Sequence, residues 1–137
     1  MVSSYNKYST ATTAYKQEGI LTASPVELVV MLYDELVKQL KIAKICIENK
    51  SIEKANNALK LSGDIVVELT KGLDFNYGIS RDLMALYDFM LNDIYKANAF
   101  KDMNKIEEVL EVANELRAAW VEIKSSSAVR IATILED

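Results

Sequence analysis

The chain has 137 residues, half of them apolar and about a quarter charged, with a formal net charge of −4. This length suits one domain with a single core, and the composition is that of an ordinary globular protein. The acidic balance disfavours a general binder of nucleic acid or of anionic membranes. With 4 Gly and 1 Pro, the chain has too few turn residues for a fold of many short strands.

The first 23 residues differ in composition from the rest of the chain. They are rich in Ser, Thr, Ala and Tyr, and Tyr15 and Ile20 are among their few large apolar residues. We therefore expect residues 1–23 to form a mobile segment that needs a surface to lie on. The N-terminus lacks the apolar core of a signal peptide, and no apolar run is long enough to span a bilayer. The sequence thus predicts a cytoplasmic protein without stable membrane insertion.

A helix start follows this segment. Ser24 is an N-cap residue, Pro25 suits the first helical position, and Glu27 lies three residues after Ser24, which completes a capping box. The helix is predicted over residues 25–47. Its apolar residues recur every three or four positions, as in an amphipathic helix: Leu28, Leu32, Leu36, Leu40, Ala43 and Ile47.

Three further helices are predicted over residues 52–71, 81–98 and 103–124, with Ser51, Ser80 and Asp102 as their N-caps. Each repeats the three- and four-residue apolar spacing of a bundle seam. In the fourth helix this seam contains Trp120, which we expect to be buried. The serine run at 125–127 interrupts the pattern, so residues 125–137 are predicted to form a loose tail or a short extra helix.

The predicted fold is all-α, an antiparallel up-down four-helix bundle over residues 24–124. The short connections favour antiparallel neighbours. The loosely attached segments 1–23 and 125–137 flank this bundle. Because four seams in one chain can satisfy each other, the sequence favours a monomer, although the heptad-like spacing would also suit a structural helical oligomer.

The residue types argue against an enzyme. The chain has no histidine, so it lacks the commonest general base and the commonest metal ligand, and it has no glycine-rich phosphate loop. Its single cysteine, Cys46, lies among apolar residues and is interpreted as buried filler. We therefore expect no catalytic site, no metal and no cofactor.

Two predicted helices carry more apolar residues than one seam requires. Met and Tyr among them suit an adaptable contact surface. This surplus has two interpretations: a wide core-facing arc on each helix, or a groove that receives a partner helix. The groove hypothesis takes as its partner-binding residues Val26, Val30, Tyr33, Val37, Met84, Tyr87, Leu91 and Tyr95, together with Tyr15 and Ile20 of the N-terminal segment.

Four motifs resemble those of a known family. They are Ala14-Tyr15, Thr22-Ala23-Ser24-Pro25 with Met31-Leu32-Tyr33-Asp34, Leu86-Tyr87-Asp88-Phe89-Met90, and Leu116-Arg117-Ala118-Ala119-Trp120. In this order and spacing they resemble the flagellar export chaperones (FliS). The resemblance implies a cytoplasmic helical bundle that binds the disordered C-terminal segment of flagellin. Binding would prevent premature polymerisation and deliver the client to an export gate protein, and the N-terminal segment would cover the groove when no client is bound.

Another class of partner-binding protein remains open at this stage. A helical-bundle adaptor or regulator could present the same groove to a different amphipathic helix. The bound client distinguishes these hypotheses.

Overall fold

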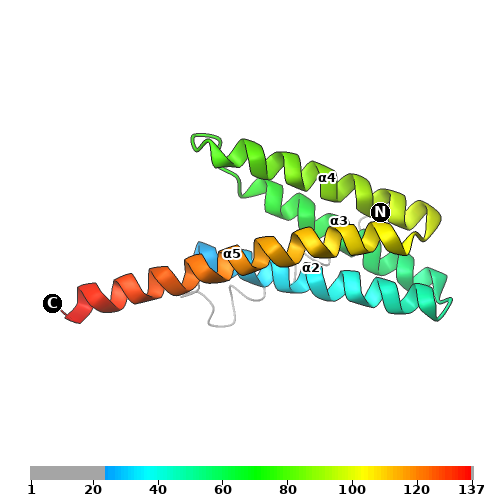
Figure 1. Cartoon of the computed structure of the whole chain (residues 1–137), viewed down its shortest axis with the longest axis horizontal. Coiled ribbons are helices and arrows are strands. Elements are labelled where there is room, and N and C mark those ends of the chain that lie inside the picture. Colours follow the sequence, from blue (N-terminus) through cyan, green and yellow to red (C-terminus); the bar gives the residue numbers. More distant parts are fainter. Residues whose placement is uncertain (1–23, 137) are drawn as a thin grey trace.

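The computed structural model describes residues 24–136, and side chains within residues 24–126. It contains four helices and is all-α, as predicted (Figure 1). The helices are α2 (Pro25–Glu48), α3 (Ile52–Lys71), α4 (Ile79–Phe100) and α5 (Met103–Glu136). The predicted mobile segment 1–23, including Tyr15 and Ile20, lies outside the described residues.

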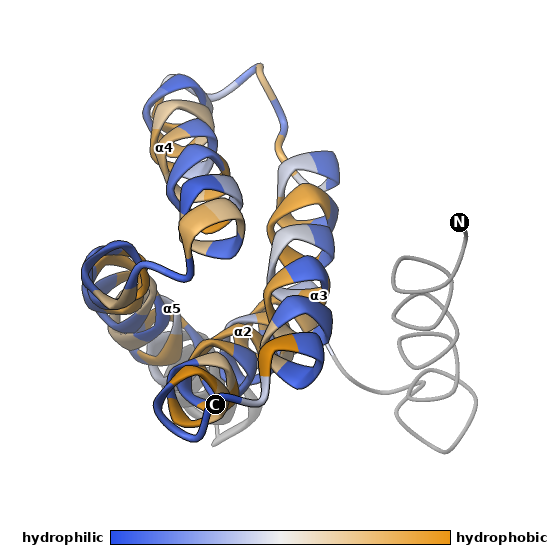
Figure 2. Ribbon diagram, turned by 90° about the vertical axis from the view of Figure 1, so that its right-hand side faces the viewer, coloured by the Kyte–Doolittle hydropathy of each residue, from blue (hydrophilic) through white to orange (hydrophobic). Residues whose placement is uncertain are grey.

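The four helices run alternately up and down around a common interior. α2 packs against α3 and α5, and α4 packs against the same two helices. α2 and α4 therefore occupy opposite corners of the bundle, as the view along its length shows (Figure 2). The predicted antiparallel four-helix bundle is confirmed.

Two of the predicted N-caps form with their expected hydrogen bonds. The Ser24 side chain accepts a hydrogen bond from the backbone N–H of Glu27 at 3.1 Å. The Asp102 carboxylate accepts one from the backbone N–H of Asn104 at 2.9 Å. Each bond satisfies one of the backbone donors that a helix start leaves unpaired.

The other two predicted N-caps differ from expectation. Ser51 occupies the N-cap position of α3 without a side-chain cap bond. Ser80 lies inside α4, because the turn at 74–78 winds directly into the helix and Gly78 takes the N-cap position. The Ser80 hydroxyl instead donates to the backbone carbonyl of Asp74 at 2.6 Å. The prediction that Ser80 caps this helix is therefore wrong.

The predicted end of the fourth helix at residue 124 is also wrong. α5 continues through the serine run to Glu136 and extends past the start of α2 (Figure 1). Serine costs a helix only about 0.5 kcal/mol per residue relative to alanine. No Gly or Pro follows to stop the helix, so three serines alone do not end it.

The core lies between all four helices and follows the predicted seams. Cys46 is buried, as expected. The largest fully buried side chains are drawn from every helix: Tyr33, Leu36, Leu40, Leu59, Ile65, Val66, Tyr87, Met90, Ile94, Ile106 and Val109. The bundle is therefore well packed along its middle. An apolar cleft lies at one end.

Candidate functional site

An apolar cleft opens at the end of the bundle where α2 and α4 begin and α3 ends. Figure 1 shows α4 and α5 diverging towards this end. The cleft has a volume of about 350 Å³, and most of its lining side chains are apolar. They come from all four helices and from the α3–α4 turn: Val29, Leu32, Leu69, Leu73, Tyr77, Ile79, Leu83, Tyr87, Trp120 and Ile123.

A pair of buried tyrosines lies next to this cleft. The hydroxyls of Tyr33 on α2 and Tyr87 on α4 are 2.6 Å apart and share a hydrogen bond. Because α2 and α4 occupy opposite corners, this bond crosses the bundle diagonally. Tyr33 is 0% exposed and Tyr87 2%, so the pair belongs to the core, while Tyr87 also contributes to the cleft wall.

Burial keeps both tyrosines protonated. The pKa of Tyr33 is raised far above its usual range, first by desolvation and then by the hydrogen bond and charge of Tyr87, while a hydrogen bond with the Trp120 side chain acts in the opposite direction. Desolvation also raises the pKa of Tyr87, and its bond with Tyr33 opposes the rise. Both hydroxyls therefore remain neutral hydrogen-bond donors at physiological pH.

Exposed apolar side chains surround the mouth of the cleft. Tyr77, Ile79 and Ile123 line it and are each exposed. Phe75, in the same turn as Tyr77, is exposed as well. Single exposed apolar residues are ordinary, but several gathered at the mouth of an apolar cleft indicate a contact surface.

Ion pairs join α5 to its neighbours along the length of the bundle. Arg117 pairs with Asp34 of α2, and Glu107 pairs with Lys44 further along the same two helices. Between α4 and α5 the Lys105 ammonium lies 3.8 Å from the Asp93 carboxylate. Two ion pairs thus join α5 to α2, and one joins it to α4, the helix that diverges from it.

Asp93 is a buried carboxylate, and one of its two oxygens lacks a hydrogen-bond partner within the described part of the chain. It is 4% exposed, and its Oδ2 has no hydrogen-bond partner among the described residues. Its pKa is raised by desolvation first and by Glu108 second, against the opposing effect of Lys105 and Lys96. The folded state therefore disfavours the ionised form of Asp93 relative to the unfolded chain.

Asp93→Asn is expected to raise the free energy of unfolding by about 1 kcal/mol at neutral pH, because a charge leaves a buried position. Because the pKa of Asp93 is raised in the folded state, its ionised form destabilises the fold at pH values above that pKa. Protonation of the carboxylate removes this destabilisation as the pH falls through the pKa. The gain from Asp93→Asn should therefore shrink in acid. Urea unfolding over a pH series measures both effects, and a gain that does not change with pH would contradict this explanation.

The predicted partner-binding residues of α2 are mostly in the core. Val30, Tyr33 and Val37 are buried, and Val26 at the start of the helix is partly exposed. The predicted groove joined this stripe to one on α4, but the two helices lie at opposite corners and meet only through buried side chains such as Tyr33 and Tyr87. In this structure the two stripes therefore do not form the walls of one groove.

The predicted residues of α4 are more accessible. Met84 and Leu91 are partly buried, and Tyr95 is 60% exposed beside Gly63 of α3, where an added Cβ would lie 3.8 Å from its ring. Among the predicted residues that the structure describes, Tyr87 alone lines the cleft. The surplus apolar residues thus divide between core and surface.

Sequence reasoning missed most of the cleft. Leu32 and Leu83 belong to predicted seams and Val29 to the apolar arc beside one, so periodicity assigns them to the core. Ile79 precedes the predicted start of its helix. The available signal was the α3–α4 turn, where the large side chains of Phe75, Tyr77 and Ile79 alternate with smaller residues.

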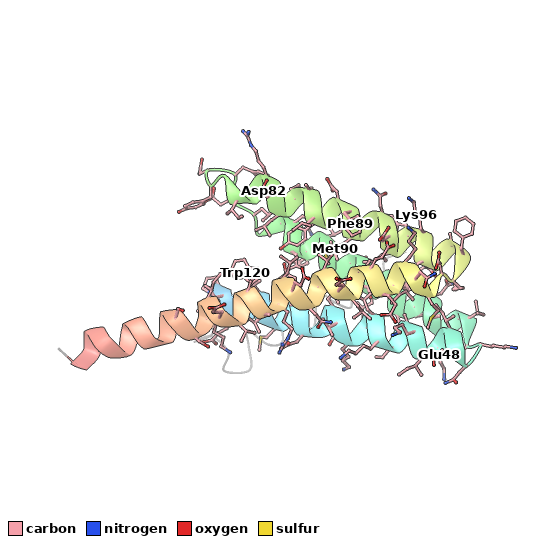
Figure 3. All side chains as sticks on the ribbon, in the orientation of Figure 1. Glu48, Asp82, Phe89, Met90, Lys96 and Trp120 are labelled. Carbon is pink, nitrogen blue, oxygen red and sulfur yellow. The ribbon has the colours of Figure 1, made fainter. Side chains whose placement is uncertain are left out.

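Trp120 also differs from its predicted position. It packs against the core and lines the cleft, but it is only partly buried (Figure 3). Ala113 is the last buried residue of α5 among the described side chains, and Leu116 and Trp120 pack against the core but are only partly buried. The prediction that Trp120 is buried in the seam is therefore wrong.

Trp120→Ala is expected to cost about 1.5–3 kcal/mol of unfolding free energy, less than the ~3–5 kcal/mol of a fully buried tryptophan. The ring still packs against the core. Urea denaturation followed by circular dichroism gives the value. A cost of ~4 kcal/mol or more would mean that α4 closes over the ring in solution.

The fold and the cleft define a helical-bundle binding protein. Within the described part of the chain, no group of three or more potential ligands is placed to hold a metal. None of the described helices has the length and apolarity needed to cross a membrane.

Comparison with known proteins identifies the family. The family described as "Flagellar protein FliS" matches residues 7–127. The flagellar secretion chaperone FliS of Bacillus subtilis is 35% identical over 108 residues, which are 79% of this chain and 81% of that protein. The FliS of Vibrio cholerae is 31% identical over 116 residues, 80% and 85% of the two chains. The chain therefore belongs to the FliS family of flagellar secretion chaperones, which are not enzymes.

A solved structure supports the fold. The crystal structure of a bacterial flagellar chaperone superposes with a TM-score of 0.71 at 17% identity, covering 85% of this chain and 97% of that one. At this identity the likeness concerns the arrangement of the helices.

Proposed function

We propose that this chaperone acts in the cytoplasm, where it binds the C-terminal segment of flagellin, prevents premature polymerisation and delivers the client to the export gate. The observation that carries the proposal is the apolar cleft at the open end of the bundle, with Tyr77, Ile79 and Ile123 exposed at its mouth. Its family membership as a flagellar secretion chaperone supports the choice of client.

The size of the cleft suits part of a helix rather than a whole one. An engineered apolar cavity of about 150 Å³ binds one benzene molecule. A cleft of about 350 Å³ therefore has room for about two large apolar side chains. Such side chains lie next to each other on a client helix when they are three or four residues apart.

Accessible residues outside the cleft extend the proposed surface along α4. Tyr95 of α4 lies beside Gly63 of α3, and the helical spacing puts Met84 and Leu91 on the same face of α4 as Tyr95. Val26 lies at the start of α2. We assign these residues to contacts with further parts of the client. A segment that folds on binding has to bury a large area to offset its loss of freedom, so several separate contacts are expected.

Calorimetric titration with a synthetic peptide of the C-terminal segment of flagellin from the same organism tests the proposal. We expect one peptide per chaperone and a negative heat-capacity change, the mark of apolar burial. A matched peptide with its large apolar residues replaced by serine should not bind. If neither peptide binds, flagellin's C-terminal segment is not the client.

We also propose that residues 1–23 cover the cleft in the absence of a client. Residues 29 and 32, in the first turns of α2, line the cleft, so the preceding chain is attached at its edge. Tyr15 and Ile20 supply apolar side chains for such a contact. A covering segment competes with the client and lowers its apparent affinity by the fraction of molecules in which the cleft is open.

Deleting residues 1–18 is therefore expected to leave the bundle folded and client binding equal or tighter. Circular dichroism checks the fold, and calorimetry with the flagellin peptide measures the affinity. If the truncated chain stays folded but loses the peptide, the segment forms part of the binding site and does not compete with the client.

A further inference from the structure

The hydrogen bonds beside the cleft leave one donor without an acceptor. The hydroxyls of Tyr33 and Tyr87 together present two hydrogens. One of them serves the 2.6 Å bond between the two hydroxyls. The remaining hydroxyl hydrogen has no acceptor among the described residues. Both tyrosines are at least 98% buried, so this unpaired donor is costly.

When a ligand is present, the unpaired hydrogen should belong to whichever of the two tyrosine hydroxyls lies nearer the cleft. Tyr33 is 0% exposed and does not line the cleft, whereas Tyr87 does. Of the two tyrosines that share the bond, only Tyr87 is therefore placed next to an acceptor in the cleft. Donation would then run in one direction, from Tyr33 to Tyr87 and from Tyr87 to the ligand.

Tyr77 in the cleft wall is exposed to water, and the polar groups of Ser80, Asp74 and Glu68 already have partners. The Ser80 hydroxyl donates to the carbonyl of Asp74, and the Asp74 carboxylate accepts from the backbone N–H of Asn76. Glu68 pairs with Lys71. The carboxylates of Glu68 and Asp74 would repel an anionic ligand, which favours a neutral acceptor.

We propose that the cleft selects an apolar group bearing a neutral carbonyl oxygen, and that Tyr87 is the residue that recognises this oxygen. The inference rests on the proposed function for the natural occupant. In a client helix the matching group is a backbone carbonyl of the last turn, because the last four carbonyls of a helix have no partner within it. A helix that ends in the cleft supplies apolar side chains and this acceptor together.

Two small probes test the carbonyl preference without flagellin. Para-fluoroacetophenone and para-fluoroethylbenzene share a ring and have side chains of similar size, and only the first has a carbonyl. Fluorine NMR measures the dissociation constant of each. Tyr87→Phe removes the proposed donor. Tyr77→Phe is the matched control, because Tyr77 lines the same cleft but is 65% exposed.

We expect Tyr87→Phe to lower the affinity ratio of ketone to hydrocarbon roughly threefold to tenfold, the effect of one neutral hydrogen bond. Tyr77→Phe should leave the ratio unchanged. The carbonyl stretch of the bound ketone should lie at a lower wavenumber in the unmodified chain than in Tyr87→Phe. Circular dichroism establishes that both variants are folded.

Three results would overturn the proposal: an unchanged ratio in Tyr87→Phe, an equal loss of both probes, which is the result of a purely structural role, or no binding of either probe. Each is independent of the titration with flagellin peptide. A negative result with the two probes would therefore not contradict flagellin as the client. A negative result with the flagellin peptide would not contradict the carbonyl site.

Discussion

Replacing Tyr33 with alanine is expected to lower the free energy of unfolding by about 3–5 kcal/mol. The ring is fully buried between all four helices, and its removal leaves a cavity that a packed bundle fills only in part. The substitution also removes the hydrogen-bond partner of the Tyr87 hydroxyl. Urea denaturation followed by circular dichroism measures the loss.

Two further variants separate the ring from its hydroxyl. Tyr33→Phe keeps the ring and should cost about 1–2 kcal/mol, since it leaves buried polar groups without a partner. Tyr77→Phe removes an exposed hydroxyl and should change stability by less than about 0.5 kcal/mol. If Tyr33→Phe were as harmless as Tyr77→Phe, the diagonal hydrogen bond would contribute nothing to the fold.

The tyrosine pair explains how the bundle tolerates an open end. α2 and α4 share no direct helix contact, yet the Tyr33–Tyr87 bond joins them through the core. The start of α4 can therefore diverge from α5 while the middle of the bundle remains closed. The cleft lies on one side of this bond, and the close-packed core lies on the other.

Local signals in the sequence were sufficient for most of the fold. Ser24 and Asp102 cap their helices as predicted, because an N-cap depends on hydrogen bonds within one turn. The seams also hold, since their spacing dictates which residues face inward. Gly72 ends α3 at the expected position. Each of these features is decided within a few residues along the chain.

The candidate site was beyond such reasoning because it depends on how helices diverge. Periodicity assigned Trp120 to a closed seam, but the helix that would cover it diverges. It also gave Tyr33 and Tyr87 to one groove, although they meet inside the core. Residues such as Leu83 have the same pattern whether they face a core or a cleft. Only the geometry between helices distinguishes a core-facing residue from a cleft-facing one, and this geometry cannot be read from one sequence.

The second large effect is expected on binding. Ile79→Glu should lower the affinity for the flagellin peptide roughly 10- to 100-fold, measured by calorimetry. Ile79 lines the cleft mouth and is 62% exposed, so a bound client would cover it. The substitution removes apolar contact area and places a charge where water is displaced. The chaperone itself should remain stable, because acidic residues suit the first turn of a helix and Ile79 begins α4.

Ile45→Glu provides the matched control for this result. Ile45 is also an exposed isoleucine on a helix, at 56%, but it lies on α2 outside the cleft. It receives the same change in charge and in apolar area, so it should leave peptide affinity within about threefold of the unmodified chain. Wild-type affinity in Ile79→Glu, or an equal loss in both variants, would show that the client does not dock at the open end of the bundle. A loss confined to Ile79→Glu places the client at the cleft, because only the position of the new charge differs between the two variants.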